Sequence, residues 1–101
     1  MCIRDSPLID TSEARSVTYS NFGSQALIRD DIELSEKFFK QALAIKPDNI
    51  TAHNNLGVLY WKRKANPELA IKHLERAIEI NPDFESARQR LDVLKAELQR
   101  P

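Results

Sequence analysis

The sequence predicts an all-α fold, an α-solenoid of stacked antiparallel helix-turn-helix repeats. The only two glycines, Gly23 and Gly57, lie 34 residues apart, and each follows an asparagine and a large apolar residue. When one additional residue is allowed in the second half, Pro47 aligns with Pro82. Apolar residues also recur at helical three- and four-residue steps. Self-similarity at a period of about 20 to 50 residues is typical of a repeat array, whose units contact only their neighbours.

The first pair of helices is expected over residues 12–29 and 32–46, where apolar residues recur at helical spacing. Adjacent aspartates, Asp30 and Asp31, end the first helix. Pro47 ends the second, because the residue before a proline is disfavoured in helical geometry.

The second pair of helices is expected over residues 49–63 and 67–81. Asp48 or Asn49 can cap the third helix, since both side chains accept hydrogen bonds from the first turn. The Asn66-Pro67 pair is a start signal for the fourth helix. Asparagine caps well, and a proline at the first helical position loses no N–H that the helix needs.

A fifth helix is expected over residues 84–99, with Asp83 as its cap. Its apolar stripe could also belong to a coiled coil, although that normally requires at least about three heptads. We favour a terminal helix that covers the last repeat, either as a cap or as the opening of a third repeat. The residues of the stripe are Ala87, Leu91, Leu94 and Leu98.

The first six residues, Met1 to Ser6, resemble the translated end of a tagmentation sequencing adapter, and a genuine start is the alternative. If they are foreign, Cys2, the only cysteine, is foreign too, and the true N-terminus lies upstream. The expected organisation is an adapter-derived segment 1–6, a polar segment 7–15 with a frayed helix entry, a first repeat 16–49, a second repeat 50–84 with the insertion near 64–66, and a capping helix or partial third repeat 85–101.

The repeating residues resemble the tetratricopeptide repeat, a unit of about 34 residues with the pattern W-x2-L-G-x2-Y, then A-x3-F, then P. The resemblance covers about residues 16–84 and implies a tetratricopeptide-like superhelix. The matching positions of the first copy are Tyr19, Phe22, Gly23, Ala26, Ser35, Phe39 and Pro47. Those of the second copy are His53, Leu56, Gly57, Tyr60, Ala70, Leu74 and Pro82.

These positions have packing roles that need no knowledge of the family. Small residues let antiparallel helices approach closely, and large apolar residues fill the space between them. The small residues are Gly23, Gly57, Ala42, Ala70 and Ala77, and the large ones are Phe22, Phe39, Leu56, Tyr60 and Leu74.

The resemblance implies that a partner binds on the concave face formed by the first helix of each repeat. Asparagine side chains can donate to and accept from a peptide backbone, and Trp61 is of a type enriched in binding hot spots. The alternative is that Asn21 and Asn55 only satisfy backbone groups and that Trp61 packs on the next helix. The candidate partner-binding residues are Ser20, Asn21, Ser24, Asn54, Asn55, Val58, Trp61, Lys62 and Arg90.

One subclass of the family grips the C-terminal carboxylate of heat-shock proteins with a clamp of lysines, arginine and asparagines. Asn55 and Arg90 match that clamp. Ser20, Ser24 and Ser86 stand where lysine, asparagine and lysine are expected. This partner is therefore not favoured.

We expect a non-catalytic interaction scaffold that binds a protein or peptide, with no cofactor and no metal. Basic and acidic residues both number 15, so a global field favours neither nucleic acid nor membrane, and no apolar run approaches the ~20 residues of a membrane span. No phosphate loop, nucleophile elbow or metal-binding helix motif is found. The alternative is a repeat segment of a longer enzyme, such as a glycosyltransferase, sulfotransferase or protease. Self-association through the uncovered face of the first repeat is also expected, and a cytoplasmic location is favoured.

Overall fold

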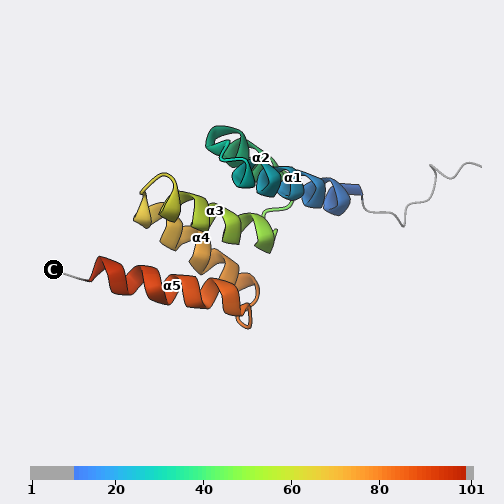
Figure 1. Ribbon diagram of the computed structural model, residues 1–101. Coiled ribbons are helices and arrows are strands. Elements are labelled where there is room, and N and C mark those ends of the chain that lie inside the picture. Colours follow the sequence, from blue (N-terminus) through green and yellow to red (C-terminus); the bar gives the residue numbers. More distant parts are fainter. Residues whose placement is uncertain (1–10, 100–101) are drawn as a thin grey trace, which may run out of the picture.

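The computed structural model describes residues 11–99, which form five α-helices and the turns between them (Figure 1). The expected adapter-derived segment lies outside the described residues. No helix in the described part of the chain is long and apolar enough to cross a membrane. The prediction of an all-α fold is confirmed. The helices are α1 Thr11–Ile28, α2 Ile32–Ile45, α3 Ile50–Lys62, α4 Pro67–Ile80 and α5 Glu85–Leu98.

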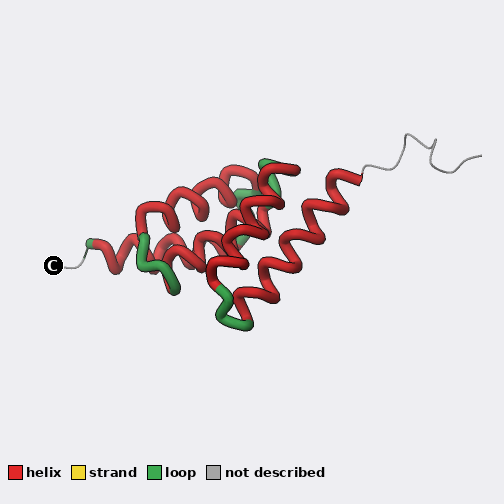
Figure 2. The backbone as a smooth tube through the Cα atoms, turned by 90° about the horizontal axis from the view of Figure 1, so that it is seen from above, coloured by secondary structure: helices red, strands yellow, loops and turns green. Residues whose placement is uncertain are grey.

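The helices form two successive hairpins, α1 with α2 and α3 with α4, followed by α5. Each hairpin helix packs most extensively against its hairpin partner, and α2 and α4 join one unit to the next by packing on α3 and α5. The first helices of successive units also touch, since α1 contacts α3 and α3 contacts α5. Figure 2 shows the short turns that connect these helices.

The turn inside each hairpin contains one residue in the left-handed region. Asp30 has φ 65° in the first turn, and Ala65 has φ 52° in the second. This left-handed residue lets a backbone N–H that follows the first helix of the hairpin donate to a carbonyl in the last turns of that helix. In the first hairpin, the Asp31 N–H donates to the Ala26 carbonyl at 2.8 Å. The second turn, residues 63–66, is one residue longer than the first, residues 29–31.

Side-chain caps follow the sequence signals at two helices and depart from them at a third. The Asn49 Oδ1 accepts from the Ala52 N–H at 3.0 Å, and the Asn66 Oδ1 accepts from the Leu69 N–H at 3.3 Å. The predicted Asp83 cap is wrong, because Phe84 occupies the cap position of α5 and makes no side-chain capping bond. At the other end, α1 begins at Thr11, so residues 11–15 of the expected polar entry are helical.

The core is a strip between the helices, and the glycines lie where two helices approach closely. Gly23 faces the Phe39 ring in the first hairpin, and Gly57 faces Leu74 in the second. One packing expectation is wrong, because Phe22 is 48% exposed instead of filling the space between helices. The other predicted packing residues are buried, namely Phe39, Ala42, Leu56, Tyr60, Ala70, Leu74 and Ala77, whereas Pro47 and Pro82 are exposed just beyond the helix ends.

Candidate partner-binding face

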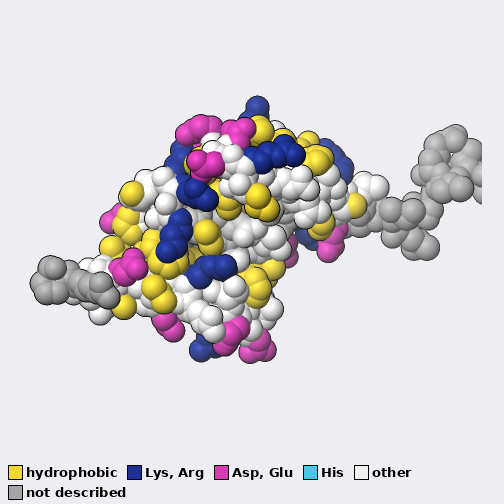
Figure 3. Space-filling view, viewed as in Figure 1, with side chains coloured by type: hydrophobic (Ala, Val, Ile, Leu, Met, Phe, Trp, Pro, Cys, Tyr) yellow, Lys and Arg dark blue, Asp and Glu magenta, His cyan; other side chains and the backbone are white. Residues whose placement is uncertain are grey.

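The candidate site is the surface presented by α1, α3 and α5, here called the first-helix face. Because α1 touches α3 and α3 touches α5, side chains from three parts of the sequence meet there. In the view of Figure 3, Lys and Arg side chains lie among hydrophobic ones near the middle of the molecule, where α3 runs in Figure 1. The surface therefore combines cationic and apolar groups.

At the junction of α1 and α3, the half-buried Asn55 donates from Nδ2 to the Ser24 Oγ at 3.1 Å. Asn21, about one helical turn before Ser24 on α1, is exposed. Only one hydrogen of the Asn55 amide is used by Ser24, so the carbonyl oxygen and the second hydrogen can serve a bound chain. The alternative role for Asn55, satisfying backbone groups, does not describe this contact, because its acceptor is a side chain.

Ser20, also predicted for this surface, is 2% exposed, so its predicted contact with a partner is wrong. Its Oγ accepts from the Asn49 Nδ2 at 2.8 Å, and the same nitrogen donates to the Ser16 Oγ at 2.8 Å. Ser16 in turn donates to the Ala42 carbonyl at 2.9 Å. These bonds fasten α1 to the turn between α2 and α3. Sequence reasoning missed the cluster, although two serines four residues apart on one helix face are a readable signal.

At the junction of α3 and α5, Arg90 is held by two side chains. Its Nη1 donates to the Asn54 Oδ1 at 3.2 Å and to the Ser86 Oγ at 2.7 Å. Asn54 is only 7% exposed, so it positions Arg90 rather than offering its own amide to a partner. The remaining guanidinium donors of the half-buried Arg90 are the groups that this junction can present.

Trp61 is partly buried against the core and also contacts polar groups on the first-helix face. Its Nε1–H donates to the Glu97 Oε1 of α5 at 3.2 Å. The Lys62 Nζ lies 4.0 Å from the centre of the indole ring, within the range of a cation–π contact. Val58, one helical turn earlier, is half-buried as well. The indole is therefore fixed on α3 with part of its surface accessible.

A second polar cluster lies between α2 and the second hairpin. The Tyr60 hydroxyl donates to the Glu36 carboxylate, which also pairs with Lys64 at 3.0 Å and with Lys40 at 3.2 Å. Burial alone would raise the pKa of Glu36, but the hydrogen bonds from Tyr60, Lys64 and Lys40 outweigh it and lower the pKa to about 2. Burial and the same carboxylate raise the pKa of Tyr60. This cluster fastens the first repeat to the second.

Two histidines lie beside this cluster and define each other's tautomers. The His53 Nε2 is 2.8 Å from the Pro47 carbonyl, which can only accept, so Nε2 carries the proton. The neutral His53 Nδ1 is then an acceptor, and it lies 3.1 Å from the His73 Nδ1, which must donate. Burial lowers the pKa of both imidazoles, and that of His73 falls to about 4. The pair is a packing element, and the described residues contain no group of three or more metal-ligating side chains.

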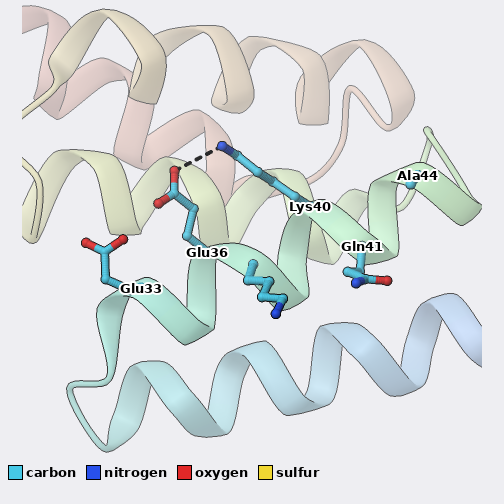
Figure 4. Close-up of a pocket in the computed structure, with 6 residues that line it drawn as sticks. Glu33, Glu36, Lys40, Gln41 and Ala44 are labelled. Carbon is cyan, nitrogen blue, oxygen red and sulfur yellow. Dashed lines mark ion pairs between the residues drawn. The ribbon is translucent and has the colours of Figure 1, made fainter.

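A hollow of about 470 Å³ lies elsewhere, along α2. Figure 4 shows Glu36 and Lys40 joined by an ion pair and Glu33 beside Glu36, on the side of α2 that faces away from α1. The lining comes from a single helix and carries both signs of charge, and both glutamates are already paired, Glu36 with Lys40 and Glu33 with Lys64. The lining residues are Glu33, Glu36, Lys37, Lys40, Gln41 and Ala44.

Two antiparallel hairpins, glycines at the helix approaches and a polar first-helix face together define a helical repeat scaffold. The tetratricopeptide repeat family model matches residues 14–83. The chain belongs to the tetratricopeptide repeat family, as its repeating residues predicted. This family and fold are generally those of non-catalytic protein-interaction modules.

Known proteins agree with this assignment. The chain is 34% identical over 77 residues to the tetratricopeptide repeat domain-containing protein PYG7, chloroplastic, of Arabidopsis thaliana. The match covers 76% of this chain and 25% of that protein, so the chain spans about a quarter of its relative. Among solved structures, the second tetratricopeptide repeat of Spaghetti (RPAP3), bound to the HSP90 peptide SRMEEVD, matches with a TM-score of 0.80 and 17% identity. That match covers 87% of this chain and 81% of the other, and it shows a shared fold.

Proposed function

We propose that this protein is an interaction scaffold that binds an extended peptide or a partner helix across its first-helix face. The observation that carries the proposal is a set of side-chain hydrogen bonds between helices on that face. Asn55 joins α3 to Ser24 of α1, and Arg90 joins α5 to Asn54 of α3. Side chains held in this way lose little conformational entropy when a partner binds.

The chemistry of the face suits a peptide. The Asn55 amide can pair with a peptide backbone, the Arg90 guanidinium with a carbonyl or carboxylate, and the Trp61 indole with an apolar side chain. The peptide bound to the RPAP3 repeat supports a peptide as the class of partner. In this chain, however, Ser86 is bonded to Arg90 and Ser20 is buried, so two of the expected clamp cations are replaced by small hydroxyl groups. The heat-shock C-terminus is therefore not the partner we propose.

The alternative of a repeat segment within a longer enzyme is not favoured by the family match or by the structural neighbour. The proposed role needs no chemistry beyond hydrogen bonding and apolar contact. We therefore propose a scaffold that is not itself an enzyme.

The test is selection of peptides on the full chain from a random library, followed by affinity measurement with labelled peptides. Asn55→Ala and Trp61→Ala should each weaken a selected peptide by about tenfold or more. Trp61→Phe, which keeps an aromatic ring, should weaken it less. Gln41→Ala, in the exposed hollow of α2, is the matched control and should leave affinity unchanged.

The first-helix face would be the wrong surface if selected peptides bound the Asn55→Ala and Trp61→Ala variants as tightly as the parent chain. Circular dichroism of each variant shows whether a loss of peptide binding is accompanied by a loss of helical structure. The single tryptophan supplies a second readout, because a peptide on this face should change the fluorescence of Trp61.

A further inference from the structure

The side of the first hairpin that faces away from the second carries an exposed aromatic cluster. The centre of the Phe38 ring of α2 lies 5.4 Å from the centre of the Phe22 ring and 6.1 Å from that of the Tyr19 ring, both on α1. Phe22 is 48% exposed, and Leu34 of α2 is 39% exposed. We call this surface the outer face, made of Tyr19, Phe22, Ala26, Leu34 and Phe38.

The internal repeat shows that this type of surface is normally covered. Leu56 occupies in the second repeat the position that Phe22 occupies in the first, and Leu56 is fully buried. Tyr60, the counterpart of Ala26, donates to Glu36 of α2, so this side of the second repeat faces the first repeat. The outer face is therefore the stacking surface of the first repeat, and stacking surfaces supply much of the stability of repeat arrays.

Hollows flank the exposed Phe22 ring on the outer face. Phe22 lines two hollows, one of about 300 Å³ that reaches Leu34 and Phe38, and one of about 420 Å³ that reaches Thr11 and Tyr19. A projecting ring between two hollows fits a second copy across a two-fold axis. The ring of each copy can enter a hollow of the other, and such reciprocal contacts characterise two-fold interfaces.

The charges around the outer face also suit a second copy. Arg29 and Asp31 both border the smaller hollow, and Arg15 borders the larger one. Because the rim carries both signs, two copies in opposite orientation can pair unlike charges. An open head-to-tail chain would instead bury the exposed apolar residues of α5, Val93 and Leu98, so a variant at Val93 distinguishes the two arrangements.

We propose that the outer face binds a second copy of this chain and forms a two-fold dimer centred on Phe22. The dimer buries the exposed rings of both copies and leaves the first-helix face accessible. The proposal concerns a different surface from the peptide site. A variant that no longer forms the dimer can therefore still be tested for peptide binding, and a variant that no longer binds peptide can still be tested for the dimer.

The test is sedimentation equilibrium of the full 101-residue chain in reducing buffer, which excludes a disulfide through Cys2. The expected mass is twice the chain mass of 11.6 kDa. Phe22→Asp should weaken the dimer by about 30-fold or more, because it places a charge at the centre of the contact. Val93→Asp on α5 is the matched control, since Val93 is 49% exposed, and it should remain a dimer.

Leu34→Asp provides a second variant at the edge of the same face and should also yield monomers, with helix content checked by circular dichroism. A chain that is monomeric at about 100 µM would overturn the proposal. So would a dimer that persists in both Phe22→Asp and Leu34→Asp, or an assembly whose mass grows without limit as concentration rises.

Discussion

Gly57 and Leu74 approach so closely that a side chain at position 57 has no room: a Cβ placed there would lie 2.7 Å from the Leu74 Cγ. The first hairpin repeats the relationship, with a Cβ at Gly23 lying 2.8 Å from the Phe39 ring. Atoms closer than ordinary van der Waals contact repel steeply, so helix or side chain would have to shift. The glycines thus set the distance between the helices of each repeat.

Gly57→Ala should destabilise the protein by about 1–2 kcal/mol. Overpacking typically lowers the free energy of unfolding by about 1–3 kcal/mol, and the higher helix propensity of alanine offsets up to about 1 kcal/mol of this loss. The measurement is the free energy of unfolding from urea titration. The control repeats the substitution in a Leu74→Ala background, where the clash is absent and the change should be neutral or stabilising. An equal cost in both backgrounds would show that Leu74 is not the obstacle.

Ala65→Gly should stabilise the protein by about 0.5–1 kcal/mol, since Ala65 has φ 52° and glycine adopts this region without the steric cost of a Cβ. Its matched control is Ala44→Gly, at an exposed position in the last turn of α2, where glycine should cost up to about 0.5–1 kcal/mol. Thermal or urea unfolding should show opposite signs for the two variants. Destabilisation by both would mean that the turn imposes no strain on Ala65.

The Glu36 cluster should make the protein lose stability in strong acid. The pKa of Glu36 is about 2 in the folded protein, against an ordinary value of 4.5, so the unfolded chain takes up its proton first as pH falls. The stabilisation is complete above about pH 4.5 and is lost as pH falls toward 2. Because the lysines that pair with Glu36 are partly exposed to solvent, this stabilisation amounts to about 1–3 kcal/mol.

Urea unfolding between pH 7 and 2 tests this expectation. Glu36→Gln should reduce the loss of stability below about pH 4.5 and should also lower stability at neutral pH, because Tyr60 and Lys64 lose their carboxylate. Glu79→Gln, at an exposed ion pair with Arg76, should change stability by less than about 1 kcal/mol at any pH. A pH dependence in Glu36→Gln equal to that of the parent would rule out the cluster as its source.

The histidine pair should produce an earlier acid-dependent loss. Burial, followed by the neighbouring charges of His53, Lys40 and Lys72, lowers the pKa of His73 from 6.5 to about 4. The unfolded chain therefore binds this proton first, and stability falls between about pH 6.5 and 4, by about 1–3 kcal/mol. His73→Phe introduces the residue found at Phe38 in the first repeat and should flatten this part of the profile. Constant parent stability between pH 6.5 and 4 would contradict the effect.

Most of the fold was predictable because it rests on local pattern. Helical periodicity, the Asn66 cap and the proline after each second helix depend on residues a few positions apart, and the structure places the helices accordingly. The Asp83 cap failed although local preference favours Asp over Phe, because Asp83 lies in the turn before α5, where its N–H donates to the Asn81 Oδ1. The candidate site was predictable only as a face, since the family pattern gives the helices but not what each side chain contacts.

By itself, the sequence determined the number of helices, their pairing into repeats and the glycine positions where the helices meet, because these follow from spacing along the chain. Only the tertiary structure decided which side chains remain accessible. Ser20 became buried because Asn49, 29 residues away, bonds to it, and Phe22 stays exposed because the described residues contain no unit that packs on the outer face. Exposure depends on what a neighbouring unit covers, and the sequence of one repeat does not contain that information.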